Sequence, residues 1–283
     1  MAPIPTPLIP LLRLQQAGAG RVYLKVDSFH PTASAFDRVA AALVDAAPGA
    51  AVVMASMGDL AIAVAPHCNA RGKLLSVYLP ESVTPERREI LRSFGATVTL
   101  TPVEEHYVGA VAAAQNHGQR HPEVSLLASD ALRRAEGMAE TLGREWLAQL
   151  IGVGLPPQAV VLGVGTGATL CGVGTVLQRR FPELALVPVF PTTRPHHLTG
   201  LGLSDPGEIL SGLRLALAEQ VSAPEAWALR GELARKEGLL VSISSAANVV
   251  AAQRMAARFG PGSRVETLAW STGEREFSLG SYF

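Results

Sequence analysis

The sequence predicts an α/β protein built as two doubly wound lobes, and two observations support this prediction. Short runs rich in β-branched and apolar residues alternate along the chain with stretches of helical length, and clusters of glycine and proline fall between them. The chain also has 283 residues, which is enough for one large α/β domain or two modest ones. Strands that alternate with helices of this length imply parallel β-α units with right-handed crossovers.

The alternation begins at residues 21–26, whose β-branched and aromatic content is typical of a strand. A turn at 28–32 follows, and then a helix for which Ser34 is the expected N-cap, with Asp37 in its first turn. The later elements expected in this half are strand 50–54, a helix from 59 to about 69, strand 74–79, helix 85–94, strand 97–100 and helix 107–117.

The second half is expected to open with a long helix over about 133–151. Strand 159–162 then enters a glycine-rich run, and a helix continues to about residue 180. The later elements expected are strand 184–190, a loop at 191–206, helix 224–237, strand 239–242, helix 246–258 and strand 264–270. The two expected lobes are residues 36–141, the smaller one, and residues 1–35 with 142–283, the larger one.

Composition excludes several classes of protein. Hydrophobic residues make up 48% of the chain and charged residues 17%, which predicts a folded protein rather than a disordered one. Basic and acidic residues balance at 24 each, so neither nucleic acid nor a membrane surface is an expected partner. The sequence contains no apolar run of about 18 residues and no charged leader, which favours a cytoplasmic protein. Cys68 and Cys171 lack the spacing of a zinc site or a disulfide framework, and we expect both to be small buried residues.

The run from Gly163 to Thr169 lies between a predicted strand and a predicted helix, where backbone N–H groups can approach an anion. Two other interpretations remain open for it. The glycines could serve only tight packing, or Gly163, Gly165 and Ala168 could form a G-x-G-x-x-A dinucleotide fingerprint. The fingerprint needs an acidic residue near the end of the next strand, but Glu183 precedes that strand. We therefore expect an anion-binding loop without a dinucleotide.

A set of short motifs occurs along the chain in a fixed order. They are Thr6-Pro7-Leu8, residues 30–38, Ala55-Ser56-Met57-Gly58-Asp59, Leu79-Pro80-Glu81 with Glu86-Arg87-Arg88, residues 163–169, residues 237–246 and Ser271-Thr272-Gly273-Glu274-Arg275. They resemble T-P-L, N-P-x-G-S-x-K-D-R, T-S-G-N-T, M-P-E with E-R-R, G-x-G-T-G-G-T, E-G-I-L-V-G-I-S-S-G and D-S-G-E-R. These are motifs of fold-type II pyridoxal-phosphate (PLP) enzymes of the cysteine synthase (O-acetylserine sulfhydrylase) type.

This resemblance implies a tryptophan synthase β-subunit-like fold and, because the family is generally dimeric, a homodimer. It also implies two groups of site residues. The residues that would hold the cofactor are Gly165, Thr166, Gly167, Ala168 and Thr169 at its phosphate and Thr272 at its ring nitrogen. The residues of the implied substrate loop are Ala55, Ser56, Met57, Gly58 and Asp59.

One departure from the family pattern concerns the lysine that carries the cofactor as a Schiff base and moves the α-proton. Phe36 stands at that position, and a phenylalanine has neither an amine nor a titratable proton. The flanking matches, Ser34 and Asp37-Arg38, prevent the alignment from shifting to another lysine. The chain has three lysines, and we expect all of them to be solvated or snorkelling side chains: Lys25, Lys73 and Lys236.

A second departure lies in the implied substrate loop. Met57 adds bulk, Gly58 stands where the family has asparagine, and Asp59 adds a carboxylate close to where a substrate carboxylate would bind. Like charges repel, so an amino-acid carboxylate is disfavoured there. The phosphate end of the implied site departs less from the family pattern than the reactive end does.

The expected function is that of a non-catalytic ligand-binding or regulatory relative of cysteine synthase, a pseudoenzyme. It would hold no covalent cofactor, although PLP or another small phosphate-type anion could bind noncovalently at 163–169 in a cleft between the lobes. Two alternatives remain open. One is an amino-acid synthase or lyase of the cysteine synthase and threonine synthase group that uses noncovalent PLP, and the other is an interaction subunit for an active homologue.

Three side-chain groups are expected to be solvated surface residues: Arg87-Arg88, Arg133-Arg134 and His196-His197.

Overall fold

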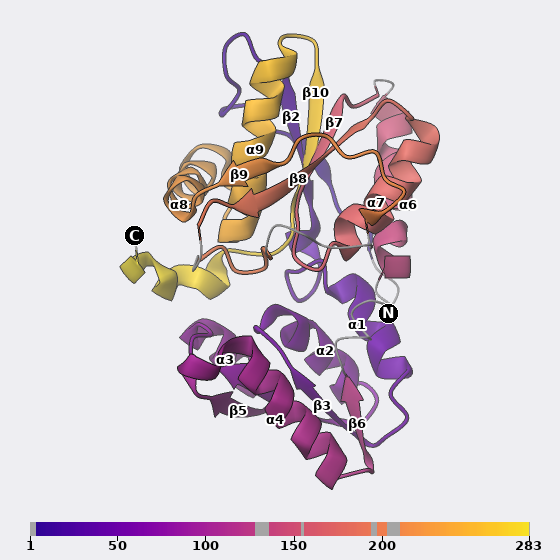
Figure 1. Cartoon of the computed structure of the whole chain (residues 1–283), viewed down its shortest axis with the longest axis vertical. Coiled ribbons are helices and arrows are strands. Elements are labelled where there is room, and N and C mark those ends of the chain that lie inside the picture. The colour runs from indigo at the N-terminus through magenta and orange to yellow at the C-terminus, as the bar shows by residue number, and fades with distance from the viewer. Residues whose placement is uncertain (1–3, 128–135, 154–155, 194–196, 203–209, 283) are drawn as a thin grey trace. The chain divides into compact units, whose positions relative to one another are not determined.

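The computed structural model describes residues 4–127, 136–153, 156–193, 197–202 and 210–282. The chain divides into two compact units, each with its own sheet (Figure 1). The first unit contains His30–Arg134 and Arg275–Tyr282, and the second contains Ile4–Phe29 and Ala135–Glu274. Residues 275–282, which were expected in the larger lobe, pack with the first unit. The predicted α/β class with parallel sheets in two domains is confirmed.

The first unit contains a four-stranded parallel sheet in the order β5-β4-β3-β6. Its strands are β3 (Ala51–Ala55), β4 (Leu74–Pro80), β5 (Thr97–Thr101) and β6 (Val124–Leu127). Its helices are α1 (Asp37–Asp45), α2 (Asp59–Asn69), α3 (Pro85–Ser93) and α4 (His106–Arg120). Helix α4 packs across all four strands, while α2 packs on β3 and β4. The central strand β3 is therefore buried along Val52, Val53 and Met54, which explains its continuous apolar sequence.

The second unit contains a six-stranded sheet in the order β1-β2-β10-β7-β8-β9, parallel except for β1 at one edge. Its strands are β1 (Leu8–Pro10), β2 (Arg21–Val26), β7 (Ala159–Gly163), β8 (Ala185–Pro191), β9 (Glu219–Val221) and β10 (Arg264–Ala269). Its helices are α6 (Glu136–Val153), α7 (Ala168–Arg180), α8 (Ala223–Glu232) and α9 (Ile243–Phe259). The shorter helical segments of the described chain are η1 (Asp27–Phe29), η2 (Val103–Glu105), η4 (Leu233–Glu237) and η5 (Glu274–Tyr282).

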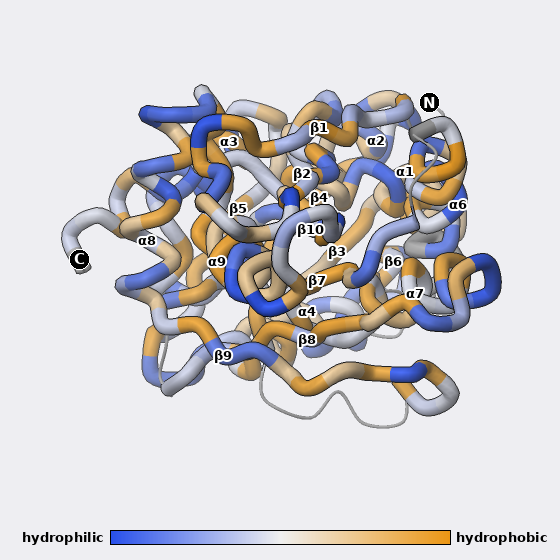
Figure 2. The backbone as a smooth tube through the Cα atoms, turned by 90° about the horizontal axis from the view of Figure 1, so that it is seen from above, coloured by the Kyte–Doolittle hydropathy of each residue, from blue (hydrophilic) through white to orange (hydrophobic). Residues whose placement is uncertain are grey.

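Helices cover both faces of the six-stranded sheet. Val161 packs with the residues of α8 and α9, whereas its neighbours Val160 and Leu162 pack with those of α6 and α7. Figure 1 shows the two helix pairs on opposite sides of the strands, and Figure 2 shows that β7 and β8 are hydrophobic along their lengths. A parallel strand covered on both faces requires apolar residues at successive positions, which the sequence supplies.

Two details of the predicted elements are wrong. Residues 239–242 form no strand, because α9 begins at Ile243 and leaves room for a single bridge, from Val241 to Thr272. Ser34 is not the N-cap of α1, because that helix begins later, at Asp37, and its N-cap is Phe36. The hydroxyl of Ser34 instead accepts from the amide of Phe36 at 3.3 Å.

The short strands β1, β6 and β9 were not predicted, since three or four residues carry too weak a periodicity. The predicted long helix 133–151 is described from Glu136 onward, and the first part of its range lies outside the described residues. Within the described part of the chain, no helix is both long enough and apolar enough to cross a membrane.

Candidate functional site

The residues expected to hold a cofactor gather at one edge of the six-stranded sheet, in the second unit. Strands β7 and β10 are parallel neighbours, so their carboxyl ends reach the same edge. The loop 163–169 follows β7, and residues 270–273 follow β10. Ligands of open α/β sheets bind beyond the carboxyl ends of the strands, so the topology places both predicted segments at the ligand-binding edge.

The predicted anion loop ends at the start of α7. Gly167 is the N-cap of this helix and has a left-handed φ of 89°, a conformation that favours glycine. Gly165 and Thr166 are exposed, Ala168 is buried and Thr169 is half-buried. The hydroxyl of Thr166 accepts from the amide of Ala168 at 3.3 Å. The first N–H groups of a helix have no acceptor within the helix, so the opening of α7 offers donors to an anion.

Packing explains another glycine of this loop. A Cβ on Gly165 would lie 2.6 Å from the carbonyl oxygen of Gly200, and one on Gly202 would lie 2.7 Å from that of Gly165. The amide of Gly202 also donates to the carbonyl of Val164 at 2.7 Å. The packing interpretation that the sequence left open therefore accounts for Gly165, whereas Gly167 is required by its own backbone conformation.

A hydroxyl cluster, consisting of Ser242, Ser244 and Ser245, lies at the amino end of α9. Ser242 is the N-cap, and its hydroxyl lies 3.2 Å from that of Ser244 and 2.7 Å from that of Ser245. Ser245 accepts from the amide of Trp270 at 2.8 Å, which ties this cluster to the segment after β10. These serines lie within the motif 237–246 and were not among the predicted site residues; the available signal was their grouping after a predicted strand.

Thr272, the residue expected at a ring nitrogen, is 8% exposed and is held firmly in place. Its hydroxyl accepts from the amide of Glu274 at 3.3 Å. Arg230 donates to the carbonyls of Val241 and Gly273 at 3.1 and 2.7 Å, and so fixes the backbone on both sides of the bridge that Thr272 makes. A buried arginine donating to two carbonyls gives this segment a single arrangement.

The position expected for the cofactor lysine lies in the first unit, at the entry to α1. Phe36 is half-buried there. The preceding turn is held by Asp37, whose carboxylate accepts from the hydroxyl of Thr32 at 2.5 Å. Ala33, which stands at the glycine of the family pattern, keeps a left-handed φ of 52°. The turn therefore has a backbone conformation typical of glycine at Ala33, and the side chain at position 36 carries no amine.

The substrate loop 55–59 connects β3 to α2. The hydroxyl of Ser56 accepts from the amides of Gly58 and Ala61 at 2.9 and 3.4 Å, so the loop satisfies part of its own hydrogen-bonding capacity. Gly58 has a φ of 115°, and a Cβ on it would lie 2.4 Å from Cδ of Arg87. An asparagine at this position would be strained and would also collide with Arg87. Met57 is 38% exposed.

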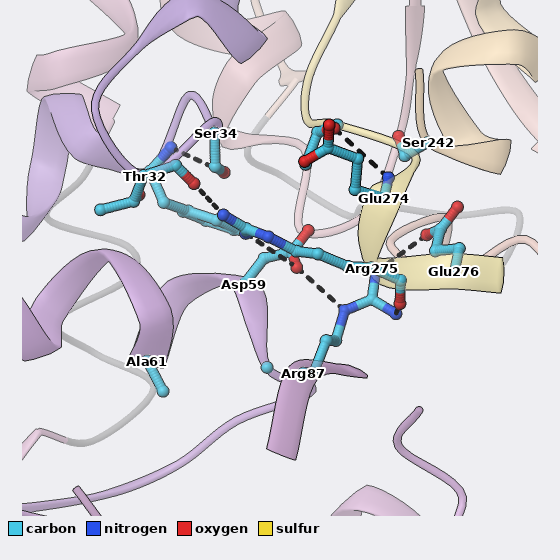
Figure 3. Close-up of polar contacts among 12 residues, drawn as sticks. Thr32, Ser34, Asp59, Ala61, Arg87, Ser242, Glu274, Arg275 and Glu276 are labelled. Atoms are coloured by element: carbon cyan, nitrogen blue, oxygen red, sulfur yellow. Dashed lines mark hydrogen bonds and ion pairs between the residues drawn. The ribbon is translucent and has the colours of Figure 1, made fainter. Parts of the chain in front are cut away.

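A buried charge network surrounds this loop (Figure 3). The Asp59 carboxylate accepts from Arg87 at 2.9 Å and from Arg275 at 3.3 Å. Arg87 also donates to Glu276 at 2.8 Å, and Arg275 to the carbonyl of Thr32. Burial lowers the pKa of Arg87, but the carboxylates of Asp59 and Glu276 outweigh it and raise that pKa above its ordinary value.

The expectation that Arg87 belongs to a solvated helix face is thus wrong, because its side chain is 3% exposed. The partner carboxylates come from distant parts of the chain, which the local helix pattern cannot reveal. Arg88 donates to the carbonyl of Val83 at 2.9 Å. Residues 133–134 and His196 lie outside the described residues, and His197 is exposed.

The expectation of solvated lysines is wrong for Lys25, which is fully buried. Its ammonium donates to the carbonyl of Thr6 at 2.6 Å and to the carboxylate of Glu145. Lys73 donates to two backbone carbonyls of the loop before β3, and Lys236 pairs with Glu232 at 2.9 Å on the surface. Burial of Lys25 is possible because its charge is paired within the second unit.

Cys68 and Cys171 do not form a disulfide with each other. Cys68 is buried as predicted, and burial raises the pKa of its thiol, whereas Cys171 is half-buried. No group of three or more histidine, cysteine or acidic side chains placed to hold a metal ion occurs in the described residues.

Comparison with known proteins agrees with these features. Residues 1–269 match the model of the family described as pyridoxal-phosphate dependent enzyme, and the chain belongs to that family. The cysteine synthase of Staphylococcus aureus is 32% identical over 294 residues, covering 98% of this chain and 94% of the relative.

Two solved structures are similar over nearly the whole chain. The O-acetylserine dependent cystathionine beta-synthase from Helicobacter pylori matches with a TM-score of 0.89 and 25% identity, over 98% of this chain and 96% of that one. O-ureido-L-serine synthase matches with a TM-score of 0.87 and 27% identity, over 96% and 90%. The fold is therefore the fold-type II, cysteine synthase-like fold that the motifs implied.

The residues present fit one end of PLP. The amide donors at the start of α7 and the hydroxyls of Thr166 and Thr169 suit its phosphate, and Thr272 offers a hydroxyl at the same sheet edge. No covalent link fits at position 36, because its side chain is a benzyl group. PLP, when bound, supplies an electron sink for carbanions, and the protein supplies its orientation.

Proposed function

We propose that this chain is a non-catalytic, ligand-binding relative of cysteine synthase that takes a phosphate-bearing anion at the loop 163–169. The single observation that carries the proposal is the opening of α7, where a left-handed Gly167 leads from an exposed loop into a 13-residue helix. Partial positive charge at a helix amino end favours phosphate and sulfate. The hydroxyls of Thr166 and Thr169 add donors beside the same loop.

Two features of the first unit lead us to propose that lysine-dependent chemistry is absent. At position 36 the side chain can neither attack an aldehyde carbon nor accept a proton. The substrate loop has bulk at Met57 and a negative charge at Asp59, both unfavourable to an amino-acid carboxylate. We infer that PLP, if it is the anion, binds noncovalently.

Calorimetric titration of the protein with inorganic phosphate and with PLP tests the proposal. We expect saturable binding of both by the wild-type chain. Gly167→Ala should weaken phosphate binding at least 10-fold, because the strained N-cap misplaces the first amides of α7. Gly212→Ala is the matched control, since Gly212 has the same φ of 89° and open space around its Cβ.

The control separates binding from stability. The substitution introduces the same backbone strain in both variants, so we expect a similar fall in melting temperature. If only Gly167→Ala also loses phosphate affinity, an anion site at the loop 163–169 is supported. If the wild-type chain shows no saturable binding of phosphate or PLP, the loop 163–169 has only a structural role. The function of an interaction subunit is then favoured.

The second candidate function is that of an enzyme that uses noncovalent PLP. The observation favouring it is the 32% identity to a cysteine synthase over 98% of the chain. Turnover of O-acetylserine and sulfide in the presence of added PLP would identify this function, and it would contradict the non-catalytic proposal.

A further inference from the structure

The charge network of the first unit pairs two guanidiniums with two carboxylates. It contains the guanidiniums of Arg87 and Arg275 and the carboxylates of Asp59 and Glu276. The exposed fractions of these side chains are 3% and 4% for the arginines, 1% for Glu276 and 14% for Asp59. Each guanidinium has a carboxylate partner, and the carboxylate with the largest exposed fraction is that of Asp59.

Asp59 lies where a bound anion would be held. It is the first residue of the 11-residue helix α2, whose amino end favours negative charge. One of its oxygens, Oδ1, accepts from Nε of Arg87 at 2.9 Å and from Nη1 of Arg275 at 3.3 Å. A carboxylate between two guanidiniums and a helix end has the contacts that a protein ordinarily offers to a ligand carboxylate.

Two amides of the loop 55–59 are also engaged within the protein. The amide of Ser56 donates to the carbonyl of Tyr78 at 3.1 Å, and the amide of Gly58 donates to the hydroxyl of Ser56 at 2.9 Å. The side chain of Arg87 fills the space beside Gly58 in which a larger residue would project. An incoming carboxylate would therefore meet two amides that are already bonded and two guanidiniums that are already paired with Asp59.

We propose that Asp59 determines ligand specificity as a built-in carboxylate, which occupies the anion position of loop 55–59 and excludes the carboxylate of an amino acid. This inference deepens the proposed function. It rests on that function in one respect only, namely that phosphate-type anions are the ligands left once amino-acid carboxylates are excluded. Removal of the Asp59 side chain should convert the loop into a receptor for small carboxylates, because two buried guanidiniums would then face a vacant position.

The test compares melting temperatures in sodium acetate and in sodium chloride at equal ionic strength. For Asp59→Ala we expect a lower melting temperature in chloride and a saturable rise in acetate, with half of the effect at millimolar concentration. The wild-type chain should respond equally to the two salts. Asp45→Ala is the matched control, because Asp45 pairs with Arg71 at 2.6 Å on the surface of the same unit and leaves no buried charge behind.

Asp59→Asn provides a second variant, since the amide removes the charge but still fills the position, and it should show no acetate effect. If Asp59→Ala unfolds in chloride, recovery of the folded chain in acetate supports the proposal. If Asp59→Ala does not respond to acetate, whether it is folded or unfolded in chloride, the proposal is overturned. Saturable acetate binding by the wild-type chain, measured by calorimetry, overturns it without any variant.

Phosphate titration of the wild-type chain and of Asp59→Ala keeps the two proposals distinguishable. Asp59 lies in the first unit and the loop 163–169 in the second, so phosphate affinity should be unchanged in Asp59→Ala. If the wild-type chain binds no phosphate, the proposed function is contradicted, whereas the conclusion from the acetate experiment is unaffected.

Discussion

Single residues of this chain retain the backbone of the family pattern while changing its side chains, and Ala33 shows this best. Its φ of 52° is a left-handed conformation that costs a non-glycine residue about 1–2 kcal/mol. The hydroxyl of Thr32 and the carboxylate of Asp37 hold the turn in place despite that cost. The surroundings of Ala33 therefore hold the turn in a conformation that alanine alone would disfavour.

Ala33→Gly should therefore stabilise the protein. Relief of the left-handed strain exceeds the entropic cost of glycine, so we expect a gain of about 0.5–1 kcal/mol, read as a rise of roughly 2 °C in melting temperature. Ala42→Gly, an exposed position inside α1, is the control and should lose about 1 kcal/mol. A loss of stability in Ala33→Gly would show that the positive φ carries no strain.

Lys25 provides a second prediction at this scale. Its substitution by methionine leaves the Glu145 carboxylate and the Thr6 carbonyl without their ammonium partner. We expect a loss of about 3 kcal/mol or more in the free energy of unfolding, measured by urea denaturation. Lys236→Met removes an exposed helix pair with Glu232 and should cost less than about 0.5 kcal/mol. Similar losses in the two variants would contradict the structural role of Lys25.

At the scale of elements, the C-terminal segment η5 is fastened to α3. Glu86 accepts from the amide and the hydroxyl of Ser278, both at 2.8 Å, and the hydroxyl of Thr84 donates to the carbonyl of Arg275 at 2.7 Å. Partial burial acts to raise the pKa of Glu86, but hydrogen bonds from its own amide and from Ser278 outweigh it and hold that pKa below its ordinary value of 4.5.

This contact should make the docking of η5 dependent on pH. Because the pKa of Glu86 is lower in the folded chain, its stabilising contribution is complete above pH 4.5 and is lost as the pH falls through the folded value. We expect hydrogen-exchange protection of the Ser278 amide to decrease on acidification below pH 4.5. Glu86→Gln should lose that protection at neutral pH, whereas Glu89→Gln, on the exposed face of α3, should keep it. Protection that survives in Glu86→Gln at neutral pH would contradict this contact.

Elements also show where sequence patterns are sufficient. The capping box of α8, formed by Ser222 and Glu225, and the apolar runs of β7 and β8 are local signals, and the structure follows them. Residues 239–242 have an equally strand-like composition but form one bridge, because the backbone partners of a strand are chosen by tertiary packing.

At the scale of the whole molecule, the chain combines the family fold with a phenylalanine at position 36, where the proposed function requires that no covalent PLP link forms. Incubation of the wild-type protein with PLP, followed by borohydride reduction and mass spectrometry, should show no stoichiometric pyridoxyl adduct. Lys25 is buried in an ion pair, and Lys73 and Lys236 are engaged elsewhere. A full equivalent of label on any of these lysines would refute the proposed loss of covalent PLP chemistry.

Restoring the amine alone should not restore activity. Phe36→Lys would still contain a substrate loop closed by Asp59 and a Gly58 that cannot be enlarged beside Arg87. We expect O-acetylserine sulfhydrylase activity at least 10²-fold below that of an active cysteine synthase, because acid–base catalysis requires a positioned substrate. Phe36→Leu serves as the control for folding. Robust turnover by Phe36→Lys would show that the loop accepts an amino-acid carboxylate.

The sequence by itself determined the order of the main elements, the parallel architecture, the position of the glycine loop at a strand end and the absence of a lysine at position 36. These properties depend on periodicity and on motifs of a few adjacent residues, which a single sequence displays. The tertiary structure alone decided that Lys25 and Arg87 are buried and that Asp59 is bound rather than free. The partners of Arg87 and Asp59, Glu276 and Arg275, lie 189 and 216 residues away along the chain. Burial and charge pairing are set by such contacts, and no local pattern encodes them.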